Sequence, residues 1–135
     1  MLATTALWPT ATALLAGFLV LVGAAHFVLP SYFHTLVPPW SWLPEARLLV
    51  LMSGGVEVVL GVGLVVGATR PFAAWGAAAL MAVYVATHVD ALLRASRDRP
   101  RWLDRPSGVV ARVLVNLVYL GWALGVAVWT SGSSL

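Results

Sequence analysis

Four long apolar stretches occupy most of this sequence, and they constrain its fold more than any other feature. They cover about residues 10–29, 48–68, 72–93 and 109–129, and each is long enough to cross a bilayer, which takes about 20 residues in a helix. Only 10% of the 135 residues are charged and 61% are hydrophobic, which is not the composition of a water-soluble domain. Backbone groups inside lipid must be hydrogen-bonded within their own segment, so continuous apolar runs predict helices. We therefore expect an all-α fold, a four-transmembrane-helix bundle in which residues 1–135 form a single membrane domain.

Two further features narrow the class of protein. Residues 1–10 contain no Arg or Lys, so the first apolar stretch lacks the basic leader of a secretory signal peptide, and we expect it to be retained as a helix. The sequence contains no Cys, which excludes disulfide exchange and thiolate nucleophiles supplied by this chain alone.

The basic residues predict how the chain is oriented. All eight are Arg, and five of them lie between the third and fourth apolar stretches: Arg94, Arg97, Arg99, Arg101 and Arg105. The positive-inside rule places this connection, residues 94–108, on the cytoplasmic side, together with residues 30–47. Both termini are then outside, and a bacterial inner (plasma) membrane is the expected location. Because orientation and anionic lipid headgroups account for the arginine cluster, we do not expect a nucleic-acid partner.

Polar residues inside the predicted spans gather in one half of the bilayer. With a rise of about 1.5 Å per residue, counted from the arginine-rich side, Glu57 lies deepest, at about 15 Å. The others lie about 4–10 Å from that side: His26, His88, Asp90, Arg112 and Asn116. This clustering does not depend on which side of the membrane is cytoplasmic.

Helical spacing predicts which of these side chains share a face. Arg112, Asn116 and Tyr119 follow one stripe of the fourth span, and Tyr84 and His88 form an i,i+4 pair on the third. A charged side chain that faces lipid costs a few kcal/mol, so we expect these stripes to face the interior of the bundle.

Glu57 lies within "SGGVEVVLG" (residues 53–61), and two interpretations of its burial remain open. In the first, Glu57 forms a polar tie between helices with Arg112 and Asn116 and only holds the bundle together. In the second, Glu57 is the floor of a pocket that opens at the proline-rich connection after the first span, where it can deliver or accept a proton. His26, His88 and Glu57 have no compact metal-ligand spacing, so we expect no metal site.

Three segments resemble the DoxX-like family of four-helix membrane proteins. They are "GAAHFVLPSYFHTLVPPW" (residues 23–40), "SGGVEVVLGVGLVV" (residues 53–66) and "AAWGAAALMAVYVATHVD" (residues 73–90). The resemblance implies that Glu57 corresponds to the family's glycine-flanked Glu, and His26 to the His of its His-Phe-x-x-Pro motif. Where many relatives carry Pro-Ala-Asn near the end of the third helix, this chain has Ala-Thr-His at residues 86–88. The family takes its name from a subunit of a thiosulfate:quinone oxidoreductase, which implies a quinone ligand and membrane redox subunits as partners.

The leading functional hypothesis is a protein that binds a hydrophobic small molecule, with quinone as the candidate cofactor, in a polar intramembrane pocket. The catalytic candidates are Glu57, His26 and His88, and the ligand-binding candidates are Asn116, Arg112, Tyr84, Tyr119 and Asp90. Of these, Asp90 is off the face of Tyr84 and His88 and can instead pair locally.

Two alternatives belong to other functional classes. One is a stand-alone acid–base enzyme, such as an isomerase, cyclase or epoxide-opening hydrolase, acting on a lipidic substrate with Glu57 as acid or base. The other is a scaffold or assembly factor in which the polar residues only hold the helices together. The small-residue patterns at residues 63–67 and 121–125 allow close helix approach, within the bundle or in a homo-oligomer.

Overall fold

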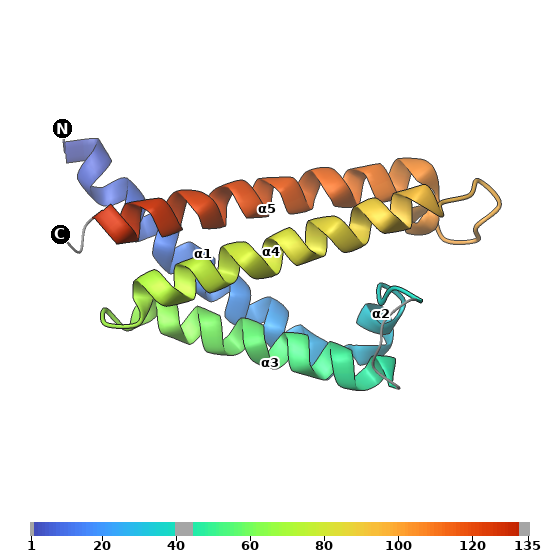
Figure 1. Ribbon diagram of the computed structural model, residues 1–135, viewed down its shortest axis with the longest axis horizontal. Helices are drawn as coiled ribbons and strands as arrows, with labels where there is room; N and C mark the ends of the chain where they lie inside the picture. Colours follow the sequence, from blue (N-terminus) through green and yellow to red (C-terminus); the bar gives the residue numbers. More distant parts are fainter. Residues whose placement is uncertain (1, 40–44, 133–135) are drawn as a thin grey trace.

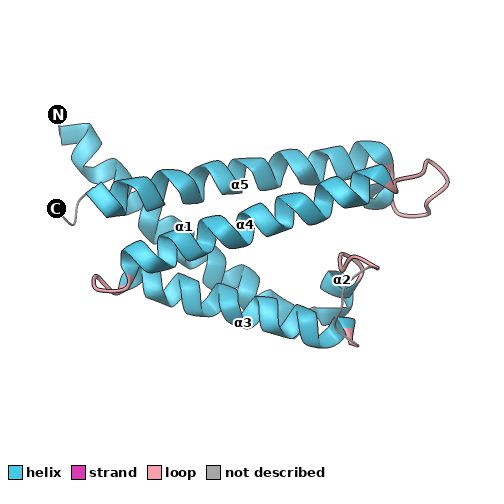
Figure 2. Ribbon diagram, viewed as in Figure 1, coloured by secondary structure: helices cyan, strands magenta, loops and turns pink. Residues whose placement is uncertain are grey.

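The computed structural model describes residues 2–39 and 45–132, and the side chains from residue 6 onward. The described residues contain helices and no strands (Figures 1 and 2), which confirms the predicted all-α fold. The elements in chain order are α1 (Leu2–Val28), α2 (Pro30–His34), α3 (Ala46–Val65), α4 (Arg70–Leu93), the short 3-10 helix η1 (Trp102–Asp104) and α5 (Pro106–Gly132). Residues 40–44, which belong to the predicted cytoplasmic connection, lie outside the described residues.

The second predicted span, about residues 48–68, begins and ends earlier than expected, because α3 covers Ala46–Val65. The side chains of Thr69 and Arg70 fold back onto the last turn of α3. Thr69 Oγ1 donates to the carbonyl of Gly63 at 2.9 Å, and Arg70 Nε donates to the carbonyl of Leu64 at 2.9 Å. Carbonyl groups at a helix end have no partner within the helix, so these side chains stabilise the early end of α3.

The four long helices form two closely packed pairs, α1 with α3 and α4 with α5. Figure 1 shows α3 and α4 close together at the short turn that joins them and diverging toward α2. The narrow end is filled by small and aliphatic side chains that are almost completely buried, among them Leu15, Leu19, Leu64, Ala77, Ala123 and Val126. The apolar core therefore occupies the narrow end, and the predicted site residues of the spans, such as His26, Glu57, His88 and Arg112, lie at the wide end.

Glycines bring α1 and α3 into direct backbone contact. A Cβ atom at Gly54 would lie 2.5 Å from His26 Cβ and 2.8 Å from the Gly23 carbonyl oxygen, and one at Gly61 would lie 2.8 Å from the Ala16 carbonyl oxygen. Gly54 lies three residues before Glu57 and Gly61 lies four residues after it, so both glycines share its face of α3. That face, including the carboxyl group, is therefore turned toward α1.

The small-residue patterns singled out in the sequence contribute less than expected to helix contacts. Gly63 approaches Ala73 and Gly125 approaches Trp8, but nothing lies within 4 Å of a Cβ atom built at Gly67 or Gly121. Gly67 lies beyond the end of α3, and Gly121 is exposed. The closest helix approach depends instead on the glycines beside Glu57.

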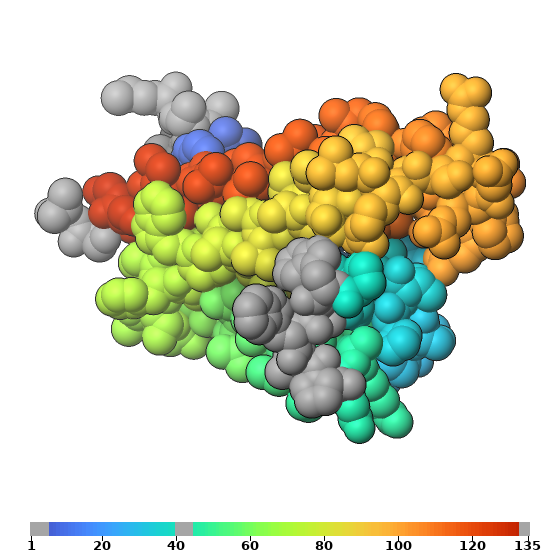
Figure 3. All heavy atoms as spheres, turned by 45° about the vertical axis from the view of Figure 1, so that its right-hand side comes forward, coloured from blue at the N-terminus to red at the C-terminus, as the bar shows by residue number. Residues whose placement is uncertain are grey.

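The surface of the bundle is apolar, as a lipid environment requires. Four helical segments are long and apolar enough to cross a membrane: Ala6–Val28, Ala46–Val65, Arg70–Leu93 and Pro106–Gly132. Large apolar side chains along them are exposed, with Phe72 80% and Leu21 72% accessible. Figure 3 shows one face of the molecule, on which α4 and α5 lie side by side above α2 and α3. The chain is an integral membrane protein whose outer surface contacts lipid.

Candidate functional site

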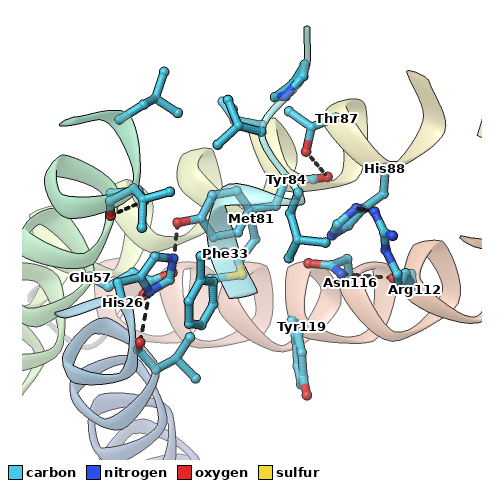
Figure 4. A pocket seen from close by; sticks show the side chains of 18 of the residues that line it. His26, Phe33, Glu57, Met81, Tyr84, Thr87, His88, Arg112, Asn116 and Tyr119 are labelled. Atoms are coloured by element: carbon cyan, nitrogen blue, oxygen red, sulfur yellow. Dashed lines mark hydrogen bonds and ion pairs between the residues drawn. The ribbon is translucent and has the colours of Figure 1, made fainter. Parts of the chain in front are cut away.

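A cavity of about 350 Å³ lies at the wide end of the bundle, between the two helix pairs. Side chains of α1, α3, α4 and α5 line it, and α2 and the segment after it contribute Tyr32, Phe33, Leu36, Val37 and Pro38. Most of the lining is apolar, and six of its polar side chains form two groups (Figure 4). His26, Glu57 and Tyr84 form one group, which we call the carboxyl cluster; His88, Arg112 and Asn116 form the other, which we call the arginine cluster.

Glu57 is the centre of the carboxyl cluster and is almost completely buried, with 1% of its surface accessible. The Tyr84 hydroxyl donates a hydrogen bond of 2.8 Å to Glu57 Oε1. His26 Nδ1 lies 3.2 Å from the other oxygen, Oε2. Three different helices therefore position this carboxyl group: α3 carries it, α4 supplies the phenol and α1 the imidazole.

The contact between His26 and Glu57 is an approach and not a full hydrogen bond. His26 Nδ1 also lies 2.9 Å from the Val22 carbonyl oxygen, which can only accept, so the proton on Nδ1 is donated there. Glu57 Oε2 is consequently buried without a hydrogen-bond partner among the described residues. Phe33 of α2 stacks on the His26 ring, with 3.6 Å between the ring centroids, and covers this cluster from the side of α2.

In the arginine cluster, Arg112 is the central group and its guanidinium is largely buried. Arg112 Nη2 lies 3.0 Å from His88 Nδ1, and because an arginine can only donate, Nδ1 is the acceptor and the His88 proton is on Nε2. Arg112 Nη1 donates to the Leu103 carbonyl at 3.0 Å and to Asp104 at 3.4 Å. Asn116 Nδ2 donates to the Arg112 carbonyl at 2.8 Å, one turn earlier in α5.

The predicted polar tie of Glu57 with Arg112 and Asn116 was wrong, because none of the described contacts of Glu57 is with either residue. Glu57 contacts Tyr84 and His26, while the hydrogen bonds of Arg112 go to His88 and to the segment that precedes α5. The carboxyl and guanidinium groups thus belong to separate clusters, because each is already engaged by side chains of neighbouring helices. Among the described residues, no three potential metal-ligating side chains come together.

With one exception, the predicted site residues all line this cavity: His26, Glu57, Tyr84, His88, Arg112, Asn116 and Tyr119. The exception is Asp90, which is not part of the lining and forms an i,i+4 ion pair with Arg94 on the partly exposed end of α4. Two residues beyond His88, Asp90 is rotated by about 200° around the helix axis and faces away.

Some residues of the site were not singled out from the sequence. The aromatic residues of α2, Tyr32 and Phe33, line the cavity although they lie outside the spans. Their signal in the sequence is the Pro-led segment "PSYFH", which starts a short helix directly after α1. Ser53 and Thr87 also line the cavity, but their hydroxyl groups donate to carbonyls of their own helices.

Together, fold and site define a class: a small four-helix integral membrane protein with a mainly apolar cavity in its membrane-spanning region and a buried carboxyl group beside it. Residues 15–127 match the family described as "Domain of unknown function (DUF8561)", and the chain belongs to this family. The matched region contains every residue that lines the cavity. No curated protein and no solved structure matches the chain.

Proposed function

We propose that this protein binds a hydrophobic small molecule with polar oxygen atoms, a quinone being the first candidate, in the cavity beside Glu57. The observation that carries the proposal is the Glu57 Oε2 atom, which is buried next to an apolar cavity without a hydrogen-bond partner among the described residues. Leaving a buried polar atom unpaired costs about 1–3 kcal/mol, and a bound ligand removes that cost by pairing with it.

The chemistry of a carboxyl group explains why quinones fit this atom. As a carboxylate, Oε2 accepts a hydrogen bond from a ligand hydroxyl, and as a protonated carboxyl group it donates one to a ligand carbonyl. A quinol presents hydroxyl groups, and a quinone presents carbonyl groups. Glu57 can therefore bind both forms and exchange a proton with them, while Tyr84 and His26 hold the carboxyl group in place.

The remaining lining residues suit the rest of such a ligand. Aromatic and aliphatic side chains, among them Phe18, Phe33 and Met81, surround the space for an apolar ring or chain. The arginine cluster lies at the other polar end of the cavity and can orient a second oxygen atom. A volume of about 350 Å³ falls within the range of small-molecule pockets. The DoxX-like resemblance adds membrane redox subunits as proposed partners.

Binding of decylubiquinone to the purified protein tests this proposal. In phosphatidylcholine nanodiscs we expect saturable binding of about one molecule per chain, measured by quenching of intrinsic tryptophan fluorescence and corrected with empty nanodiscs. Gently extracted protein should also carry a native quinone that mass spectrometry detects. If no quinone co-purifies and added quinone and quinol both fail to bind, the proposal is wrong.

A second candidate function is a stand-alone acid–base enzyme on a lipidic substrate. It is favoured by the contact of Glu57 with both a phenol and an imidazole, since this arrangement offers a proton donor and acceptor beside an apolar cavity. Turnover by purified protein that persists after quinone depletion and disappears in Glu57→Gln would favour this function.

A third candidate function is a scaffold or assembly factor. In that case Glu57→Gln would lower the stability of the protein and leave the activities of its partners unchanged.

We also propose an orientation in a bacterial inner (plasma) membrane, with residues 30–47 and 94–108 cytoplasmic and both termini outside. The chain has no Cys, so single cysteines report their location without background. In intact cells, a membrane-impermeant maleimide is expected to label Ala68→Cys, in the exposed turn before α4, and to label Ser96→Cys only after lysis. Labelling of Ser96→Cys alone in intact cells would contradict this orientation.

A further inference from the structure

A second hollow adjoins the cavity, and its walls are rich in arginine. It has a volume of about 340 Å³ and lies between residues 35–39, the end of α4 and the start of α5. We call it the arginine pocket; its charged lining residues are Arg94, Arg99, Asp104 and Arg112. In Figure 3 the segment before α5 lies directly above α2 at this end of the molecule.

The arginine pocket and the cavity share part of their walls. Leu36, Val37, Pro38, Thr87 and Arg112 line both. The side chain of Arg112 thus stands between the apolar cavity and the arginine pocket. A molecule that occupies both spaces would place one part among aliphatic and aromatic side chains and another among guanidinium groups.

The charges of the arginine pocket leave an excess of positive charge. Arg94 is paired with Asp90, and Asp104 is shared between Arg112 at 3.4 Å and Arg101 at 3.8 Å. Among the residues that the structure describes, no carboxylate pairs with Arg99, and Arg112 Nε is buried without a hydrogen-bond partner. The positive-inside rule accounts for the number of arginines in this connection, but not for their position around a hollow that adjoins the cavity.

The available hydrogen-bond donors also point to an anion. The hydroxyl groups of Thr35 and Thr87 donate to the carbonyls of Tyr32 and Tyr84, so they are already used. The guanidinium groups remain as donors, and their planar geometry matches the oxygen atoms of a phosphate. Basic pockets between transmembrane helices are a known setting for lipid phosphate groups.

We propose that the arginine pocket binds the phosphate head of an amphiphile whose apolar chain enters the cavity past Thr87 and Arg112. The inference rests on the proposed function in one respect, because it requires the cavity to accept an apolar molecule. The phosphate can belong to a bilayer phospholipid or to a single-chain phosphate monoester, and both share the chemistry that the arginines recognise.

Binding of radiolabelled n-dodecyl phosphate and n-dodecanol to the full chain in phosphatidylcholine nanodiscs tests the inference. We expect the wild-type protein to bind the phosphate more tightly than the alcohol. Arg99→Gln removes one charge-assisted hydrogen-bond donor and should weaken phosphate binding about ten-fold while leaving alcohol binding unchanged. Arg97→Gln is the matched control, because Arg97 lies in the same connection, is exposed and does not line the arginine pocket.

Phosphatidylglycerol added to the nanodiscs distinguishes the two sources of the phosphate. If it competes with dodecyl phosphate in the wild type and not in Arg99→Gln, a bilayer phospholipid occupies the pocket. If it does not compete, a single-chain monoester is the ligand. Either result supports the recognition of a phosphate head by the arginine pocket.

Three other outcomes overturn the inference. Equal losses in Arg99→Gln and Arg97→Gln would mean that only the surface potential attracts the phosphate. Binding of decylubiquinone without any preference for the phosphate over the alcohol would overturn this inference and leave the proposed function intact. If neither decylubiquinone nor its quinol nor the two amphiphiles bind, the proposed function fails as well.

Discussion

Replacing Gly54 with alanine is expected to lower the free energy of unfolding by about 3 kcal/mol, because the added methyl group has no room between α1 and α3. Its carbon would lie 2.5 Å from His26 Cβ and 2.8 Å from the Gly23 carbonyl oxygen. Neither atom is the far end of a flexible side chain, so the two helices must separate. The midpoint of thermal unfolding in detergent measures the effect.

The adjacent glycine is a matched control for this substitution. A Cβ atom at Gly55 meets nothing within 4 Å, so Gly55→Ala adds the same methyl group without a clash. Alanine favours a helix over glycine by about 1 kcal/mol, and the unfolding midpoint of Gly55→Ala should be unchanged or higher. A similar loss of stability in both variants would show that close approach of α1 and α3 is not the cause.

Replacing Glu57 with glutamine is expected to weaken binding of a quinol about ten-fold or more, which is the effect of losing one hydrogen bond to a charged acceptor. The amide oxygen can still accept the Tyr84 hydroxyl at the position of Oε1. The amide nitrogen then replaces Oε2, 3.2 Å from His26 Nδ1, where one donor faces another. Because this nitrogen cannot accept a ligand hydroxyl, quinol affinity should fall more than quinone affinity.

Titrations of decylubiquinol and decylubiquinone with each variant measure this difference. Glu45→Gln is the matched control, since it makes the same chemical change at an exposed position before α3 and should leave both affinities as in the wild type. Tyr84→Phe keeps the carboxyl group and removes the phenol, so it separates the role of Glu57 from that of its donor. Unchanged quinol affinity in Glu57→Gln would contradict the assignment of Oε2 as the ligand-binding atom.

The sequence was sufficient for the fold, because lipid leaves few alternatives to an apolar helix. Four apolar runs of about 20 residues had to be helices, and their order along the chain brings the ends of α1 and α4 and the start of α5 to the same side of the membrane. His26, His88 and Arg112 therefore share one half of the bilayer in any arrangement of the bundle. Helical periodicity also separated His88 from Asp90, which lies off the face that lines the cavity.

The partners of each polar group were decided only by the tertiary structure. Periodicity assigns a side chain to a face of its own helix, but not to a neighbouring helix, because that depends on how the helices rotate, approach and tilt. Close contact at Gly23, Gly54 and Gly61 turns Glu57 toward α1, where it meets His26.

Divergence of the two helix pairs opens the cavity between them, and Arg112 then contacts His88 and not Glu57. The sequence thus determined that His26, Glu57, His88 and Arg112 share one half of the bilayer, since hydropathy and chain order fix their depth. Only packing determined which of them meet, and which oxygen of the buried carboxyl group has no hydrogen-bond partner among the described residues.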